Sequence, residues 1–128
     1  MLETQTHPLN DFVEALVARD FDRLQKQFTP AVTFRAFVPP GVREAAGAEG
    51  AAGKFKDWFG DTDRCDVLHS SFDTIGTKQH ATYRLRVRED GKWYLCEQTI
   101  YASAGSNGIE RMDLLCSGFI QEEQLNRL

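Results

Sequence analysis

The fold is decided by residues 65–120, which read CDVLHSSFDTIGTKQHATYRLRVREDGKWYLCEQTIYASAGSNGIERMDLLCSGFI. Three turn signals divide this stretch, at 76–77 (Gly-Thr), 90–91 (Asp-Gly) and 105–108 (Gly-Ser-Asn-Gly), and all are residue types that tolerate the positive φ of hairpin turns. The segments between them are about twice the usual strand length of roughly 5–6 residues. We therefore predict four long antiparallel strands. Because strand twist accumulates along them, the sheet should curve around whatever covers its apolar face.

The first two turns also predict which residues lie opposite each other on neighbouring strands. If Ile75 faces Lys78 and Glu89 faces Lys92, both hairpins bring the same apolar residues onto one face of the sheet. The cross-strand pairs are then Phe72–Ala81, Ser70–Tyr83, Leu68–Leu85, Leu85–Cys96, Tyr83–Gln98, Ala81–Ile100 and Val87–Tyr94.

The last strand offers Met112, Leu114 and Cys116 as apolar partners of the strand before it. These residues join the same face only if the loop around Ser106 has an odd number of residues. Cys116 then lies near Cys96, and the two are either small buried hydrophobic side chains or a reactive pair of thiols. Buried thiols are usually inert, which favours the first alternative. The odd count of three cysteines and the lack of C-x-x-C spacing predict reduced thiols.

The opposite face carries two cross-strand rows of complementary charge. The carboxylate and imidazole of Asp73 and His80, with Tyr101, are candidates for an oriented acid–base group, because a carboxylate raises the basicity of an imidazole. No nucleophile is evident beside them, so a surface or subunit-contact network is the alternative. His69 and His80 fall about 13 Å apart at roughly 3.3 Å per residue, too far to share a metal ion, and no metal site is predicted. The rows are His69–Arg84–Glu97 and Asp73–His80–Tyr101.

Length and composition limit the class of protein. With 128 residues and 41% hydrophobic content, the chain is expected to form one domain over residues 1–128, with a loose tail over residues 1–8. A net charge of −4, with Lys and Arg dispersed, argues against nucleic acid or an anionic membrane as partner. The start, MLETQTHPLN, has no signal-peptide pattern, and no apolar run approaches the roughly 18 residues of a membrane span. A soluble, cytoplasmic protein is expected.

The first half of the chain predicts a cover for the sheet. Apolar residues recur at helical spacing over 8–27, with a break at Arg19-Asp20, which predicts a helix followed by a shorter helix. Residues 31–38 (AVTFRAFV) predict a strand that the Pro-Pro-Gly at 39–41 ends, and a loop should follow to about residue 47. Residues 49–60 (EGAAGKFKDWFG) predict a third helix with a large aromatic content.

This order of elements resembles the nuclear transport factor 2-like superfamily, which includes the SnoaL-like cyclases and the ketosteroid isomerases. The resemblance covers nearly the whole chain and is carried by RDFDRLQKQFTPAVTF (19–34), PPG before AGAEGAAGKFKDWFG (46–60), and NGIERMDLLCSGF (107–119). It implies an α+β fold in which the N-terminal helices pack on a strongly curved mixed or antiparallel sheet, forming a cone with a pocket. It also implies a homodimer through the convex sheet face, with an interface that would contain His69, Arg84, Glu97 and Tyr101.

Ketosteroid isomerases place a tyrosine on the first helix, an aspartate base on the first strand and a protonated aspartate near the last turn. By resemblance, these positions fall on Phe12, on Arg35, and on Gln98 or Thr99. A guanidinium cannot abstract a proton near neutral pH, and a phenylalanine cannot donate a hydrogen bond. Ketosteroid isomerisation is therefore not supported.

The same positions still describe a pocket. If Arg35 points inward, it is a permanent cation suited to a carboxylate or enolate oxygen; the alternative is that it faces outward or pairs with an acid. Tyr83 and Gln98 are the next polar candidates, although they would equally serve to bond each other within the core. Apolar walls are expected from Phe12, Phe34, Phe55, Trp58, Phe72, Met112 and Leu114. The predicted ligand-binding residues are Phe12, Arg35, Phe55, Trp58, Tyr83, Gln98, Met112 and Cys116.

From these observations we expect a SnoaL-like domain of unassigned reaction that binds a small apolar, carbonyl-bearing or carboxylate-bearing ligand in its cone. One alternative is an enzyme of the isomerase, dehydratase or cyclase kind, in which Arg35 and Tyr83 stabilise an enolate. A second alternative is a protein-interaction module, which would show a filled cone and an exposed apolar patch on its sheet. No cofactor is expected.

Overall fold

The computed structural model describes residues 7–125 of the chain. The helices and strands predicted from the sequence are all present, together with β2, β7 and α4, which were not predicted. Within the described residues, none of the helices is long and apolar enough to cross a membrane. The elements in chain order are α1 (Asn10–Val17), α2 (Phe21–Gln25), β1 (Phe28–Val38), β2 (Gly41–Ala46), α3 (Ala48–Phe59), β3 (Thr62–Ile75), β4 (Lys78–Glu89), β5 (Lys92–Gly105), β6 (Gly108–Cys116), β7 (Ile120–Gln121) and α4 (Glu122–Leu125).

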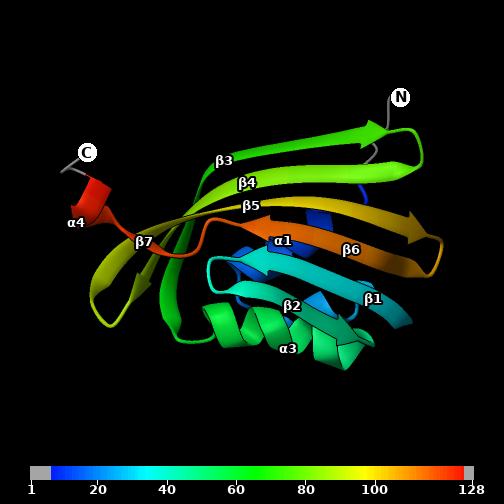
Figure 1. Ribbon diagram of the computed structural model, residues 1–128, viewed down its shortest axis with the longest axis horizontal. Helices are drawn as coiled ribbons and strands as arrows, with labels where there is room; N and C mark the ends of the chain where they lie inside the picture. The colour runs from blue at the N-terminus through cyan, green and yellow to red at the C-terminus, as the bar shows by residue number, and fades with distance from the viewer. Residues whose placement is uncertain (1–6, 126–128) are drawn as a thin grey trace.

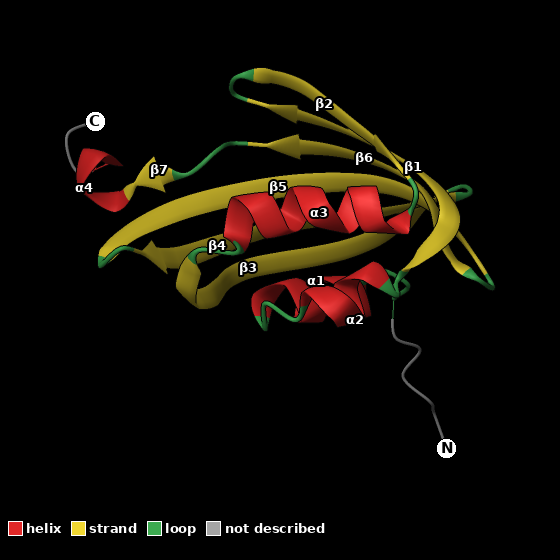
Figure 2. Cartoon of the chain, turned by 90° about the horizontal axis from the view of Figure 1, so that it is seen from below, coloured by secondary structure: helices red, strands yellow, loops and turns green. Residues whose placement is uncertain are grey.

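The strands form one open, mixed sheet in the order β2-β1-β6-β5-β4-β3, with the short β7 beside β5 (Figure 1). Strands β1 and β6 run parallel, and the other neighbouring pairs run antiparallel. Figure 2 shows α1, α2 and α3 on the same side of the curved sheet. The predicted α+β architecture, with the N-terminal helices packed on a curved sheet, is confirmed.

The predicted register is confirmed for the central hairpin and partly for the first. Every predicted pair between β4 and β5 is present, including Tyr83–Gln98. Between β3 and β4, the Leu68–Leu85 pair is wrong, because Val67 lies opposite Leu85 and Leu68 is the extra residue of a β-bulge. The bulge leaves the Leu68 side chain on the surface, 52% exposed. A bulge shifts register in the middle of a strand, where the turn at its end gives no information.

In the last hairpin, the predicted side chains point inward, but the turn differs from the one predicted. Gly105 lies opposite Gly108 across a two-residue turn, so the predicted odd-numbered loop is wrong. The register then shifts, with Glu110 as the extra residue before Arg111 pairs with Ser103. A bulge and an odd loop have the same effect on side-chain direction, because each adds one residue to one strand. The inward residues are therefore those predicted, namely Met112, Leu114 and Cys116.

A strand replaces the loop predicted before α3. β2 pairs antiparallel with β1, from Val38–Gly41 at the turn to Thr33–Ala46. Pro39 and Pro40 form the turn between them. Proline fixes φ and lacks an N–H, so it is suited to a turn as well as to the end of a sheet. The Pro-Pro-Gly sequence is therefore compatible with a strand end followed by a loop and also with a tight turn between two paired strands.

The beginning of the described chain packs on the sheet. His7 Nε2 lies 2.7 Å from the carbonyl oxygen of Asp73, and its ring lies 5.3 Å from the ring of Phe72, measured between centroids. The prediction of a loose tail over residues 1–8 is therefore wrong at His7, and residues 1–6 lie outside the described residues.

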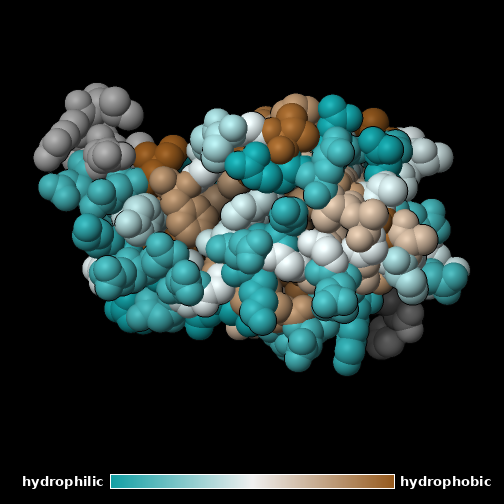
Figure 3. Space-filling view, turned by 60° about the horizontal axis from the view of Figure 1, so that its bottom comes forward, coloured by the Kyte–Doolittle hydropathy of each residue, from teal (hydrophilic) through white to brown (hydrophobic). Residues whose placement is uncertain are grey.

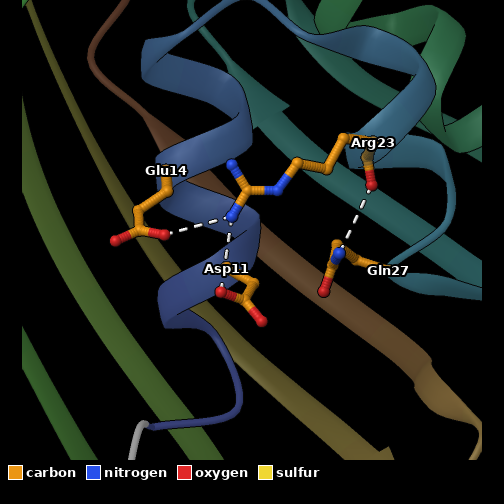
Figure 4. A network of polar contacts seen from close by, with 4 residues as sticks. All are labelled: Asp11, Glu14, Arg23 and Gln27. Atoms are coloured by element: carbon orange, nitrogen blue, oxygen red, sulfur yellow. Dashed lines mark hydrogen bonds and ion pairs between the residues drawn. The ribbon is translucent and has the colours of Figure 1, made fainter.

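Exposed polar contacts link the first two helices (Figure 4). Arg23 donates hydrogen bonds to Glu14 at 3.1 Å and to Asp11 at 3.4 Å, and the Gln27 amide donates to the Arg23 carbonyl oxygen at 3.3 Å. Asp20, at the predicted break, caps α2 by accepting from the Arg23 N–H at 3.1 Å. Exposed ion pairs contribute at most about 1 kcal/mol each, so the position of these helices depends mainly on their apolar faces.

Aromatic side chains fill the cone between the helices and the sheet. The ring of Phe55, on α3, lies 5.1 Å from that of Phe12 and 5.4 Å from that of Phe34, measured between centroids. Phe12 also packs on Phe28, at 5.7 Å. Phe12 and Phe55 have no exposed surface. The cone is a packed core at this level, and a ligand site has to be sought elsewhere.

We expect Gly108→Ala to lower the free energy of unfolding by about 1–3 kcal/mol. Gly108 has φ +122°, and an added Cβ would lie 2.7 Å from the carbonyl oxygen of Gln27. The matched control is Gly53→Ala in α3, where an added Cβ meets nothing within 4 Å and the free energy of unfolding should rise by roughly 0.4–1 kcal/mol. Urea unfolding measures both variants. Equal effects would mean that the close approach of β6 to the end of α2 is wrong.

Candidate functional site

A pocket of about 580 Å³ is lined by residues from the C-terminal end of α3 and the β1–β2 turn, which Figure 1 shows in the left half of the molecule. We call it the mouth pocket; it is lined by residues 38–40, 43, 57–58, 61, 89 and 116–119. These residues come from the β1–β2 turn, the C-terminal end of α3, the end of β4 and the segment that follows β6. Figure 3 shows hydrophobic surface on the same side of the molecule.

The mouth pocket combines apolar walls with an excess of acidic groups. Trp58 and Phe119 line it with the prolines of the β1–β2 turn, and Phe119 is held by packing on Phe59, with ring centroids 5.2 Å apart. The carboxylates outnumber the single guanidinium among the lining residues, so the local potential disfavours an anion. The charged lining residues are Asp57, Asp61, Glu89 and Arg43.

Cys116 is one of the residues that line the mouth pocket, and hydrogen-bond donors surround its thiol. Its sulfur accepts from the Gln98 side-chain amide at 3.3 Å and from the Gly118 backbone N–H at 3.3 Å. The Cys96 sulfur lies 3.7 Å away. Donation from Cys96, together with that from Gln98 and Gly118, lowers the pKa of Cys116 to about 6 against the opposing effect of burial. Donation to Cys116 and burial raise the pKa of Cys96.

Tyr83 orients the amide that reaches Cys116. The Tyr83 hydroxyl donates to Gln98 Oε1 at 2.5 Å, so the amide nitrogen of Gln98 is turned toward the thiol. Tyr83 and Gln98 have no exposed surface, and burial raises the pKa of Tyr83 well above its usual value. The phenol therefore stays protonated and acts as a fixed donor. Of the two alternatives for this pair, bonding each other within the core is the one the structure contains.

The predicted ligand-binding residues divide into two groups. Trp58 and Cys116 line the mouth pocket. The remaining inward residues have no exposed surface and belong to the core behind it: Phe12, Phe55, Tyr83, Gln98 and Met112.

Arg35 does not line the mouth pocket; it lines a separate hollow on the outer face, together with Glu44, Arg111 and Asp113. β1 alternates strictly at this point, with Phe34 and Ala36 inward, and the Arg35 side chain is 49% exposed on the outer face, 3.9 Å from the carboxylate of Glu44. The inward alternative is wrong because the side-chain period of a strand is two residues and the core takes the phenylalanine. The same alternation places Thr99 outside, 3.4 Å from the Thr82 hydroxyl.

The two polar rows lie on the outer face of the sheet, as predicted. The rings of His80 and Tyr101 are 4.6 Å apart, while the Asp73 carboxylate accepts from the backbone N–H of Thr74 at 2.8 Å. In the other row, Arg84 donates to Glu97 at 3.1 Å, and His69 is exposed opposite Arg84. Neither row contributes a residue to the mouth pocket. Among the residues the structure describes, no group of three or more His, Cys, Asp or Glu could hold a metal ion.

The lining residues that come from turns and from the ends of helices and strands were not predicted from the sequence. Asp57 and Asp61 are exposed and flank the end of α3, and the half-buried Glu89 ends β4. A carboxylate at the end of a helix or strand carries no sequence signal of its own. Gly118 has φ +79°, and an added Cβ would lie 2.6 Å from Pro39 Cγ. A glycine two residues after the last strand was therefore the available signal that the chain passes close to another segment.

Solved structures match the fold, although no protein-family model matches the chain and no curated protein matches it in sequence. A Catenulispora acidiphila protein with a ketosteroid isomerase-like fold, in complex with trimethylamine, matches with a TM-score of 0.71 at 12% identity, over 87% of this chain and 85% of that chain. A candidate polyketide cyclase from Xanthomonas campestris pv. campestris has a TM-score of 0.68 at 14% identity, covering 84% and 86%. An LEH-like epoxide hydrolase of M. tuberculosis has a TM-score of 0.66 at 11% identity, covering 86% and 80%.

The chain therefore has the nuclear transport factor 2-like fold, in the form that ketosteroid isomerase-like proteins share. At these identities the likeness shows the fold alone. Two of these neighbours, the candidate cyclase and the epoxide hydrolase, differ in the functions their descriptions give, and a shared fold does not imply a shared function.

We expect Tyr83→Phe and Gln98→Leu each to lower the free energy of unfolding by about 1–3 kcal/mol, because each leaves a buried partner without its hydrogen bond. The double variant should lose less than the sum of the two, since it leaves neither Tyr83 nor Gln98 unsatisfied. Tyr101→Phe on the outer face is the control and should change the free energy by no more than about 0.5 kcal/mol. Strict additivity in chemical unfolding would contradict the Tyr83–Gln98 bond.

Proposed function

We propose that this chain binds a small, largely apolar organic molecule, neutral or cationic, in the mouth pocket. The observation that carries the proposal is a pocket of about 580 Å³ with aromatic walls, a volume within the roughly 300–1,000 Å³ typical of small-molecule sites. The buried cluster around Phe55 keeps a ligand from going deeper, so the site is the mouth and not the whole cone.

The charge of the pocket supports a neutral or cationic ligand over the carboxylate considered from the sequence. That preference depended on an inward Arg35, which instead lies on the outer face beside Glu44. Carboxylates dominate the charged lining, and Trp58 offers a ring face to which a cation is attracted. The complex of the C. acidiphila protein with trimethylamine, a small amine that is protonated near neutral pH, is in keeping with this proposal.

The two side chains expected to stabilise an enolate in the enzyme alternative are not available in the mouth pocket. Arg35 is outside the pocket, and Tyr83 is committed to Gln98 in the core. An enolate stabilised by these two side chains is therefore not proposed.

Binding is tested with three probes of similar shape and different charge: phenyltrimethylammonium, its neutral isostere tert-butylbenzene, and benzoate. In a Trp93→Phe background, Trp58 is the remaining tryptophan of the two in the chain, and its fluorescence should change saturably with the cation and the neutral probe. Benzoate should bind weakest. The double variant Asp57→Asn/Asp61→Asn should lower the affinity for the cation several-fold, at about 0.5–1 kcal/mol per exposed charge. The affinity for the neutral probe should stay the same. Tightest binding of benzoate, or no saturation with any probe, would overturn the proposal.

We also propose that two copies of the chain pair through the outer face of the sheet. Leu115 is 61% exposed there and lies opposite Phe37, which is also exposed. Tyr101, one of the interface residues predicted from the resemblance, is exposed on the neighbouring strand β5. An exposed apolar group of this kind on a sheet face is typical of an interaction surface.

Sedimentation tests the pairing. The wild-type protein should show a concentration-dependent dimer, and Leu115→Glu should shift it to monomer because two buried carboxylates would face an apolar surface. His69→Glu should weaken association less strongly. The control is Ile75→Glu, an exposed residue at the β3–β4 hairpin, which should leave the mass unchanged. A wild-type monomer at all concentrations would exclude the dimer and favour a protein-interaction module for this face.

A further inference from the structure

We propose that Cys116 is a nucleophile that adds covalently to an α,β-unsaturated carbonyl compound bound in the mouth pocket. The inference rests on the proposed function, because the electrophile has to occupy that pocket first. It assigns the class of ligand and the atom that reacts with it.

Cys116 is placed where a ligand in the mouth pocket could meet it. It is the last residue of β6 and one of the residues that line the mouth pocket, with 9% of its surface exposed. The chain turns away immediately afterwards at Gly118, whose φ is +79°, and this turn lets the Gly118 N–H point back at the sulfur, 3.3 Å away. A ligand between Trp58 and Phe119 would occupy the same pocket that Cys116 lines.

The surroundings of the sulfur favour its anionic form. Three donors converge on it from two segments: the Gln98 amide and the Cys96 thiol on β5, and the Gly118 N–H after β6. Hydrogen bonds to a thiolate stabilise it and lower the pKa of the thiol. The two N–H donors are fixed, one by the Tyr83 hydroxyl and one by the backbone, so they need no rearrangement when the anion forms.

The other two cysteines have the opposite environment. Cys96 is 1% exposed and acts as a donor to Cys116, which makes it a positioning residue. Burial raises the pKa of Cys65 to about 11. Cys116, with its pKa lowered to about 6, is therefore the thiol of the three that is anionic near neutral pH.

Other charged groups around Cys116 act against the thiolate. Asp57 and Asp61 near the end of α3 and Glu89 at the end of β4 line the same pocket, and Arg43 on β2 is the lining cation. Carboxylates disfavour a second anion, so the anionic form depends on the donors at the sulfur. The donors Gln98 and Cys96 lower the pKa of Cys116, whereas the pocket carboxylates oppose this effect, so the two influences can be tested separately.

The shape and charge of the pocket select the class of electrophile. A pocket of about 580 Å³ with aromatic walls fits an organic molecule and is far larger than a hydroperoxide needs. Conjugated carbonyl compounds are neutral and largely apolar, as the lining requires, and their β-carbon is a soft electrophile that reacts with thiolates.

The step balances without an oxidant or a reductant. The Cys116 sulfur donates an electron pair to the β-carbon, a C–S bond forms, and the C=C π electrons move to give an enolate. The enolate takes one proton from water at the α-carbon, and the product is a saturated carbonyl compound joined to the protein by a thioether. The reverse sequence releases the ligand.

The experiment uses cyclohex-2-enone as electrophile and cyclohexanone as its saturated analogue. Intact-protein and peptide mass spectrometry should find one enone adduct, on Cys116. Its rate of formation should rise with pH to a midpoint near 6, the pKa of that thiol. Cys116→Ser should abolish the adduct, while Cys65→Ser should keep both the rate and the midpoint. In guanidinium chloride all three cysteines should react alike, which confirms that the selectivity belongs to the folded protein.

The roles of Cys96 and Gln98 as donors are tested by the pH midpoint of adduct formation on Cys116. Cys96→Ala and Gln98→Leu should each move it upward, toward the ordinary thiol pKa of about 8.5, whereas a purely structural role would change the extent of folding and leave the midpoint near 6. Circular dichroism identifies any variant that fails to fold, and Cys96→Ser then replaces Cys96→Ala as a smaller change.

The outcomes separate the inference from the proposed function. If cyclohexanone changes Trp58 fluorescence but the enone labels Cys65 or nothing, the nucleophile is wrong and ligand binding stands. If neither compound binds in the pocket, both are wrong. A wild-type midpoint near 8.5, or modification by hydrogen peroxide in place of the enone, would also overturn the assignment of Cys116 to carbonyl electrophiles.

Discussion

The rest of the structure depends on the packing of Phe55 against Phe12 and Phe34. Long twisted strands curve, and a curved sheet leaves a concave volume that has to be filled from the chain itself. The aromatic cluster fills it and has almost no exposed surface. The helices are therefore fixed to the sheet, and the mouth pocket lies beyond this cluster, where α3 ends.

The polar chain from Tyr83 through Gln98 to Cys116 connects this core to the mouth pocket. Buried polar groups have to be hydrogen-bonded, and here the Tyr83 hydroxyl bonds the Gln98 carbonyl oxygen, which leaves the amide to donate to sulfur. The Gln98 side chain therefore does two things: its carbonyl oxygen satisfies the buried Tyr83 hydroxyl, and its amide donates to the thiol that lines the pocket. Gln98 thereby joins Cys96 and Gly118 in lowering the pKa of the Cys116 thiol.

The register of the central hairpin was predictable because its turn is short and its two strands alternate cleanly between apolar and polar residues. The errors occur where one residue is inserted or where a segment lacks a partner in the local sequence. The bulges at Leu68 and Glu110 change side-chain direction in mid-strand, and β2 becomes a strand because β1 lies beside it. The inward alternative for Arg35 came from a resemblance, whereas the alternation of β1 already placed Phe34 inside.

The sequence alone determined the long hairpins, the helical cover, the inward direction of Tyr83, Gln98 and Cys116, and the outward direction of both polar rows. These features follow from periodicity and turn chemistry, which act over a few residues. Only the tertiary structure decided that the cone is filled, that the mouth is acidic, and that three donors meet at Cys116. Those outcomes depend on segments far apart in the chain, from Pro39 to Phe119, and no local pattern specifies how the curvature of a sheet brings such segments together.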